Sequence, residues 1–473
     1  MTQDTIGVLV GNRGFFPGHL CNSGREQILR ILKKKGIRTI CLSEKDTKYG
    51  SVETWEDAKK CAALFKKESE SISGILVTLP NFGDEKGIAD TLRLANLHVP
   101  VLIHAWPDDL KKMGSANRRD SFCGKISACD ILRQYRIPFT LTSRHTMDPT
   151  SELFQNDLET FIKTCRAVSA LKNLRLGAIG TRPNPFKTVR YSEKILEQEG
   201  ISIEVMDMSD LFLGIEKISN SSKKVKEKVR ILQEYIPISQ KNLKKEFLTM
   251  AKLAIVIEEW LEENDLKGFA FQCWSSIQYT LGVMPCSVLS IFSNNYIPGA
   301  CETDVTNLIG MYLLQQTSHT PSAVADWNNN YKDEPNKAVL FHCSNFPASM
   351  LKHASMNYQT IITADKAAFG CISGHLKPGP FTYIGFTTDD PAGDIIGYLG
   401  EGTITKDTLN TFGGVGVAEI PGLERLLNFI CHNGFEHHVT INLSQSSRAI
   451  YEALTNYKGW EIYAHEPCEE LSA

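Results

Sequence analysis

Carboxylate and imidazole side chains gather in three short stretches in the last third of the chain. They are Glu302 and Asp304 in "ACETDVTN", Asp326 in "AVADWNNNY", and the pair His437 and His438 in "FEHHVTINL". Oxygen and nitrogen donors of this kind are the ligands that a hard or borderline divalent cation takes in proteins. The three stretches therefore predict a metal site, provided that the fold brings them together.

Each of these residues also has a purely structural interpretation. Asp304 directly precedes the helical pattern "VTNLIGMYLL" and fits its N-cap, whereas Glu302 lies before the cap and could point back along a strand end. Asp326 lies inside a strand pattern, where aspartate is disfavoured, and this misfit favours a function. If the two histidines lie in a strand, His437 and His438 point to opposite faces, so only one can face a shared site. Pairs of this kind are often packing or surface histidines.

Other chemistries find less support in the sequence. The loops "GNRG" and "GTR" match neither of the glycine-rich phosphate-binding patterns, and there is no G-x-S-x-G nucleophile motif. Cys273 and Cys301 lie beside apolar residues without a base close in sequence. A net charge of −3 with no basic tail argues against nucleic acid as a partner.

Length and composition set the class of the protein. A chain of 473 residues is too long for one hydrophobic core, and two or three domains are expected. No apolar run reaches the roughly 18 residues that a membrane span needs, and the N-terminus lacks the basic start of a signal peptide. Thirteen cysteines without a C-x-x-C pair are typical of a reduced, cytoplasmic protein.

Short apolar strands and amphipathic helices alternate over the first two thirds of the chain. We expect strands at 5–12, 37–44, 72–80, 99–106 and 137–143, and a second series from 174–183 and 201–211 onward. Such alternation is typical of parallel sheets covered by helices on both faces. From about residue 321, short strands separated by Gly, Pro and Asp turns predict an antiparallel, barrel-like region.

The predicted fold class is therefore α/β, with two doubly wound, Rossmann-like domains followed by a C-terminal antiparallel β-barrel-like domain. We expect an N-terminal α/β domain at 1–170, a central α/β domain at 171–345 that carries the carboxylates, and a barrel-like domain at 346–473 that carries the candidate histidines.

With these elements placed, nearly the whole chain resembles the L-fucose isomerase and L-arabinose isomerase family of aldose–ketose isomerases. "GACETDVTNLIGMYLL" resembles the segment in which a metal-binding Glu, followed two residues later by an Asp, opens a helix. "VADWNNNY", "KAVLFHCSN" and "FEHHVTINL" resemble the later strands of the site, and "GNRG" resembles an N-terminal loop. The order and spacing of the metal-site motifs are closer to the fucose isomerases.

The resemblance implies a metal-dependent isomerase whose Mn²⁺, or another divalent cation, is held by Glu302, Asp326 and His438. Glu302 and Asp326 would also carry the reaction, which passes through an ene-diolate: one takes the proton from C2 and returns it to C1, and the other relays the hydroxyl proton. Candidate contacts of the sugar are Arg13, Gln272, Trp274, His342 and Asn345. The resemblance also implies a homo-oligomer, a hexamer or a trimer, in which Arg13 reaches a neighbouring subunit's site.

The sugar itself stays open at this point. Arabinose isomerases carry a further Glu where this chain has Gln272, and full-length fucose isomerases are longer. The expected substrate is a pentose or a 6-deoxyhexose of the L-fucose, D-arabinose or L-arabinose type. A non-catalytic sugar-binding or regulatory protein on the same fold, and a metal-dependent aldolase, are the two alternatives.

Overall fold

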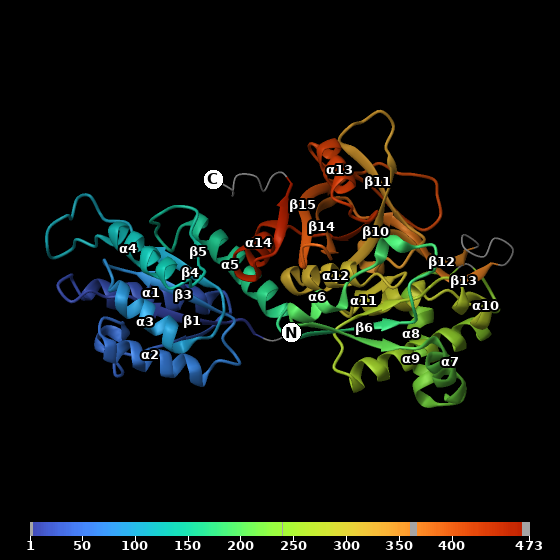
Figure 1. The fold of residues 1–473 in the computed structure, drawn as a ribbon, viewed down its shortest axis with the longest axis horizontal. Helices are drawn as coiled ribbons and strands as arrows, with labels where there is room; N and C mark the ends of the chain where they lie inside the picture. The colour runs from blue at the N-terminus through green and yellow to red at the C-terminus, as the bar shows by residue number, and fades with distance from the viewer. Residues whose placement is uncertain (1–2, 239, 360–366, 466–473) are drawn as a thin grey trace. The chain divides into compact units, whose positions relative to one another are not determined.

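The computed structural model describes residues 3–238, 240–359 and 367–465, and the chain divides into two compact units. Unit 1 is Met1–Ser169 with Glu452–Gly459, and unit 2 is Ala170–Tyr451 with Trp460–Ala473. Figure 1 shows the ribbon of the chain and labels many of its helices and strands. Each unit has its own hydrophobic core.

Unit 1 is built on a parallel sheet with the strand order β2-β1-β3-β4-β5. Its strands are β1 (Thr5–Val10), β2 (Arg38–Cys41), β3 (Gly74–Leu79), β4 (Val101–Ala105) and the short β5 (Thr140–Leu141). Its helices are α1 (His19–Lys34), α2 (Trp55–Lys67), α3 (Glu85–Ala95), α4 (Ser121–Gln134) and α5 (Glu152–Ala170). All five strands were expected from the sequence.

Both faces of this sheet are covered, as the apolar strands predicted. In β1, Leu9 belongs to the core cluster that α2, α3 and α4 line, whereas Val8 and Val10 belong to the cluster that α1 and α5 line. Successive side chains of a strand point to opposite faces, so a fully buried strand needs apolar residues at every position. The doubly wound arrangement predicted for the first part of the chain is confirmed.

Unit 2 begins with a second parallel sheet, which has the strand order β7-β6-β8-β9. Its strands are β6 (Leu174–Ile179), β7 (Ile201–Met206), β8 (Phe269–Phe271) and β9 (Gly299–Cys301). The helices of this region are α6 (Glu193–Gln198), α7 (Met208–Lys217), α8 (Lys223–Tyr235), α9 (Lys244–Glu263), α10 (Ser276–Leu281), α11 (Cys286–Asn294) and α12 (Val305–Ser318).

The remainder of unit 2 is a nine-stranded sheet in which β16 pairs with both β11 and β15 and thereby closes an antiparallel barrel. The strands are β10 (Ser322–Asn330), β11 (Lys337–His342), β12 (Leu351–Gln359), β13 (Ala368–Leu376), β14 (Gly379–Asp389), β15 (Asp394–Ile404), β16 (Gly414–Glu419), β17 (His438–Asn442) and β18 (Glu461–Ala464). The barrel-like region predicted from the turn-rich pattern is confirmed. The predicted range 171–345 assigned β10 and β11 to the central region, whereas both strands pair within the barrel sheet.

The second parallel sheet and the barrel share one hydrophobic core, and helix α12 packs against β10, β14 and β17. The barrel region also contains α13 (Leu423–His432), which the strand-rich pattern did not predict, and α14 (Ser447–Glu452). Since α12 begins directly after β9, the carboxyl end of the parallel sheet lies against the barrel strands. Within the described ranges, no helix is long and apolar enough to cross a membrane, and every cysteine is a free thiol.

Candidate metal centre

A tight turn after β9 presents the first carboxylate. Glu302 and Thr303 both have positive backbone φ values, of 63° and 57°, which residues other than glycine rarely adopt. The turn is held by a hydrogen bond from the Thr303 N–H to the carbonyl of Phe271 on the neighbouring strand β8. Such strained positions persist where the surrounding structure fixes them, and they are frequent at functional sites.

Strand pairing in the barrel brings up the other ligand candidates. Asp326 on β10 lies directly opposite His438, the first residue of β17, in the antiparallel register. On its other side, Asp326 lies opposite Phe341 of β11, whose next residue is His342. Three adjacent strands therefore present one carboxylate and two imidazoles at the same end.

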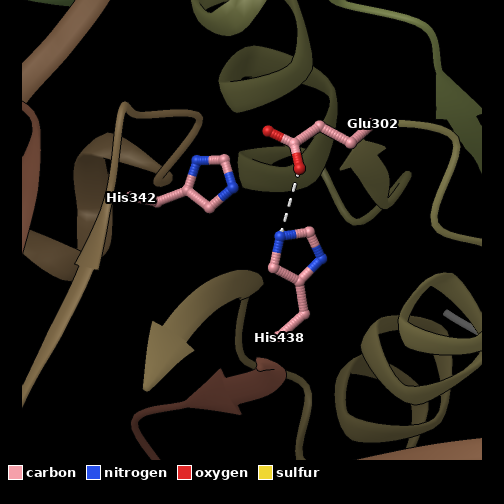
Figure 2. A group of neighbouring side chains, drawn as sticks. All are labelled: Glu302, His342 and His438. Atoms are coloured by element: carbon pink, nitrogen blue, oxygen red, sulfur yellow. Dashed lines mark ion pairs between the residues drawn. The ribbon is translucent and has the colours of Figure 1, made fainter. Parts of the chain in front are cut away.

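The side chains from the turn and from the strands converge, as Figure 2 shows for Glu302, His342 and His438. The His438 Nε2 atom lies 3.2 Å from the Glu302 Oε2 atom and 3.5 Å from the Asp326 Oδ1 atom. Ligand-capable atoms of Glu302, His342 and His438 all lie within 4.8 Å of one another. The chain thus gathers a donor set of carboxylates and imidazoles, as divalent cations require.

Asp304 has two roles in this arrangement. As predicted, its side chain caps helix α12, where it accepts a hydrogen bond of 2.9 Å from the Asn307 N–H. The same carboxylate lies 2.8 Å from the His438 Nδ1 atom. A carboxylate cannot donate, so Nδ1 carries the proton of the imidazole, and this bond fixes the tautomer and the orientation of the ring.

This tautomer provides a test of whether a metal fits. With Nδ1 protonated, Nε2 of a neutral His438 carries a lone pair, and it faces the oxygens of Glu302 and Asp326. Three lone-pair-bearing atoms at these distances repel one another unless a proton or a cation lies between them. Without a cation, the bonds to Asp304 and Glu302 outweigh the effect of burial and raise the pKa of His438 well above its usual value. A divalent cation satisfies the same atoms.

The electrostatics of Glu302 suit a ligand. Burial raises the pKa of this carboxyl, but His438, His342 and a hydrogen bond of 3.0 Å from the Trp274 Nε1–H outweigh it and hold the pKa at about 2. Glu302 is therefore ionised at neutral pH. Burial lowers the pKa of His342, but Cys343, Asp326 and Glu302 together raise it to about 9.

These residues line a cavity of about 930 Å³ in unit 2. Glu302, Asp326, His342 and His438 form its inner end, and the loop 181–186 together with Trp274–Ser276 forms the remaining wall. A cavity of this volume is of the size that binds a small molecule.

Comparison with known proteins agrees with the fold and the site. The family model described as "Fucose/sulfoquinovose isomerase, N-terminal domain" matches residues 7–172, and "L-fucose isomerase, C-terminal domain" matches residues 340–465. The second range contains His342 and His438. The chain belongs to the L-fucose isomerase-like family.

Curated relatives in this family carry the name sulfoquinovose isomerase. The protein from Priestia aryabhattai is 25% identical over 246 residues, which are 52% of this chain and 53% of that protein. The protein from Alkalicoccus urumqiensis is 22% identical over 369 residues, which are 75% of this chain and 78% of that protein. The chain thus spans about half the length of the first of these relatives. The family resemblance drawn from the sequence motifs is confirmed.

The prediction for the two neighbouring histidines was wrong in one respect. His437 and His438 both line the cavity, although strand alternation was expected to send one of them to the opposite face. Strand β17 begins only at His438, so alternation does not apply to His437, which lies in the bend before it. The His437 Nε2 atom lies 3.8 Å from Asp326 Oδ1, and its ring packs edge-on against Phe186.

The residues predicted to contact the sugar divide into three groups. Gln272, Trp274 and His342 line the cavity, but Trp274 donates to Glu302, and Gln272 is bonded to the backbone of Thr181 and Trp274. Asn345 does not line the cavity, because it is buried and donates to the Gly299 carbonyl at 3.3 Å.

Arg13 lies in unit 1, outside this site. It forms an ion pair with Glu85, donates to the Gly83 carbonyl and stacks on the ring of Phe82. Its substrate contact in a neighbouring subunit stays a prediction.

Glu436 is a residue of the site that the sequence interpretation missed. It is buried, its Oε1 atom accepts from Thr306 and Asn307, and its Oε2 atom lies 3.6 Å from His438 Nδ1. Burial and the neighbouring Asp304 raise the pKa of this carboxyl well above its usual value. Its position two residues before His438 was the available signal, but nothing in the sequence distinguishes such a glutamate from a surface residue.

Proposed function

We propose that this chain is a metal-dependent aldose–ketose isomerase. The observation that carries the proposal is the convergence of Glu302, Asp326 and His438 at one end of a small-molecule cavity, with Asp304 fixing the tautomer of the histidine. Family membership and the names of the relatives support the same activity. The function proposed from the sequence motifs agrees with this assignment.

Glu302, Asp326 and His438 would hold the cation, for which we propose Mn²⁺, and His342 lies close enough to join them. A bound divalent cation polarises the carbonyl of an open-chain aldose and stabilises the negative charge of the ene-diolate. The loop 181–186 and Trp274 enclose the sugar and reduce its access to water.

The two carboxylates then move the protons. One carboxylate removes the proton from C2 and delivers it to C1, while the hydroxyl proton passes from O2 to O1 through the other, so that the aldose becomes a ketose without net gain or loss. Both oxygens of Glu302 are engaged, by Trp274 and by His438. The distances of Asp326 to the two imidazoles are given by its Oδ1 atom, and we assign the uptake of the proton to its Oδ2 atom.

For the substrate, we propose sulfoquinovose, a glucose derivative that carries a sulfonate in place of the C6 hydroxyl group. The support is the name that the curated relatives share. L-Fucose, D-arabinose and L-arabinose, which the sequence motifs favoured, are the comparison substrates. We further propose that the protein acts in the cytoplasm as a homo-oligomer.

An isomerase assay tests the proposal. The purified full-length chain is incubated with each aldose in the presence of Mn²⁺, and ketose formation is followed by NMR. Asp326→Asn is expected to lose turnover by a factor on the order of 10³, because the amide cannot take up a proton. The matched control is Asp333→Asn, the same exchange at an exposed position of the turn after β10.

Two other outcomes contradict the proposal. Sugar binding without ketose formation would indicate a binding or regulatory protein, and formation of two shorter carbonyl products would indicate an aldolase.

A further inference from the structure

The loop between β6 and the helical turn at Lys187–Val189 joins the carboxyl edge of the second parallel sheet to the metal centre. The Thr181 N–H donates to the Gln272 Oε1 atom at 2.8 Å, and the Thr181 carbonyl accepts from the Thr303 hydroxyl at 3.2 Å. Thr303 is the neighbour of Glu302 in the strained turn. The residue that follows Thr181 is therefore held close to the ligand turn.

That residue is Arg182, and only one of the three nitrogen atoms of its guanidinium is hydrogen-bonded within the described structure. Its Nη1 atom donates to the backbone carbonyls of Pro183 and Asn184, at 2.9 and 3.0 Å. Among the described residues, no carboxylate pairs with it and no partner engages its Nε and Nη2 atoms. These two N–H groups form one edge of the planar fork, the edge that binds carboxylate, phosphate or sulfonate oxygens in pairs.

The charge of the cavity favours an anion at this edge. The acidic side chains that line it are Glu302 and Asp326, and a divalent cation on both would leave their sum neutral. Arg182 is, apart from the histidines, the basic side chain of the described lining. One positive charge is therefore left without a partner, in a place of reduced solvent access where its attraction for an anion is stronger than in water.

Arg182 also lies where the metal-site cavity continues. A second cavity of about 790 Å³ shares Thr181 and Arg182 with the first. Its other lining residues are mixed and include the basic Lys187 and Arg190 and the acidic Glu193, Asp389 and Asp390. A sugar whose carbonyl end lies at the metal centre would extend its other end toward this junction.

We propose that Arg182 is the specificity-determining residue of this enzyme, and that it binds an anionic oxyacid group at the end of the aldose opposite the carbonyl. The inference rests on the proposed isomerase function and deepens it. A sulfonate and a phosphate ester share the chemistry that the fork recognises, and the substrates used in the test distinguish them.

The kinetic test compares the wild-type chain with Arg182→Gln and Arg182→Lys. For the sulfonated aldohexose, Arg182→Gln is expected to raise KM by about ten- to a hundredfold, because a charge-assisted pair of hydrogen bonds is lost. Arg182→Lys keeps the positive charge but not the paired N–H groups, and its KM is expected to lie between those of the wild-type chain and Arg182→Gln. For a neutral 6-deoxyhexose, KM is expected to stay unchanged in all three proteins.

The matched control is Arg448→Gln, the same exchange at an exposed arginine that lines neither of the two cavities. Glucose 6-phosphate is assayed beside the sulfonate, and whichever of the two shows the larger dependence on Arg182 identifies the anion. An equal effect of Arg182→Gln on charged and neutral sugars, or no effect on either, overturns the proposal.

A binding measurement separates this proposal from the isomerase function. Calorimetry on the metal-free protein is expected to show that the sulfonated sugar binds at least tenfold more tightly than the same sugar without its sulfonate, and that Arg182→Gln removes the difference. If this difference is present while no aldose is converted, Arg182 keeps its role and the isomerase function fails. If aldoses are converted without the difference, the isomerase function stands and the role of Arg182 fails.

Discussion

The two parallel sheets of this chain both end in polar side chains, yet the two edges differ in how these groups are satisfied. In unit 1, Asn12 donates to Glu53 and accepts from Asn81, at 2.7 and 2.8 Å, and Arg13 pairs with Glu85. Donors meet acceptors throughout this network. At the edge of the second sheet, Glu302 and its partners from the barrel bring acceptor atoms face to face, so that a proton or a cation must lie between them.

This difference separates a structural edge from a chemical one. Buried polar groups that satisfy one another, such as Asn12 and Asn81, stabilise a fold and need no ligand to satisfy them. Lone pairs that converge without a donor are costly in the free protein, and the cost is recovered when a metal binds. We therefore expect the same kind of substitution to have different consequences at the two edges.

The largest expected effect comes from one exchange made in both places. Glu302→Gln is expected to reduce isomerase turnover by a factor on the order of 10³, because the amide is a poorer ligand and cannot carry the proton. Glu53→Gln keeps an oxygen that accepts from Asn12, so turnover is expected to stay at the wild-type level. Steady-state kinetics of the two variants with saturating Mn²⁺ measure this contrast. Similar losses of turnover in both variants would contradict the difference between the two edges.

Addition of a divalent cation is the next test of the difference between the two sheet edges. A cation that binds only the folded site, at a hundred times its Kd, adds about 2.7 kcal/mol to the stability of the part that holds it. We expect slower hydrogen exchange in peptides of β9 and β17, and no change in peptides of β1 and β3. Hydrogen exchange measured by mass spectrometry, once with Mn²⁺ and once with EDTA, gives the change in exchange rate for both sets of peptides in one experiment. Protection of unit 1 alone would contradict the assignment of the site.

The bond between Asp304 and His438 is expected to matter less. Asparagine caps a helix about as well as aspartate, so Asp304→Asn is expected to keep the start of α12. It weakens the bonds that the Oδ2 atom accepts from His438 and from the Asn307 side chain. Loss of such a supporting partner lowers metal affinity by about ten- to a hundredfold. Calorimetric titration with Mn²⁺ measures it, and Asp84→Asn, the same exchange at the N-cap of α3, is the matched control. An unchanged affinity would mean that His438 needs no orientation by Asp304.

The smallest effect concerns pH and the buried imidazole of unit 1. His104 lies between the Thr78 hydroxyl and the Met147 carbonyl, and no carboxylate of the described residues is bonded to it. Burial lowers its pKa to about 4. In the unfolded chain, the imidazole of His104 takes up a proton near pH 6.5. The contribution of the buried neutral imidazole to the free energy of unfolding is therefore complete above pH 6.5 and is lost as the pH falls toward 4. At pH 5 the loss is about 2 kcal/mol.

Hydrogen exchange in β4 peptides at pH 7.5 and pH 5 checks this expectation after correction for the intrinsic exchange rate. His104→Gln keeps a donor and an acceptor and is expected to reduce the difference between the two conditions, whereas His98→Asn, at an exposed position, is expected to keep it. An unchanged pH dependence in His104→Gln would show that another group titrates.

Much of the fold was predictable because its signals are local. Alternating apolar strands and amphipathic helices gave the first sheet with all five strands, and the change of pattern near residue 321 gave the barrel strands. Helix α13 was missed because its pattern lies between strands in a turn-rich region. The prediction for His437 was wrong because the start of β17 depends on pairing with β10 and not on the local sequence.

For the site, the residue types offered Glu302, Asp326 and the two histidines as candidate ligands, and the family resemblance selected Glu302, Asp326 and His438 among them. The N-cap of Asp304 was also visible, since a cap is a local feature. By itself, the sequence therefore determined the elements, the family resemblance and the candidate ligands.

Only the tertiary structure decided how these groups meet. The register of β10 against β17 and the turn after β9 bring together residues more than a hundred positions apart, and they give Asp304 its second partner and Glu436 its place beside it. They also leave one edge of the Arg182 guanidinium free at the cavity wall. Hydrogen-bond partners, burial and unmatched lone pairs are properties of pairs of groups in space, and a one-dimensional pattern does not contain them.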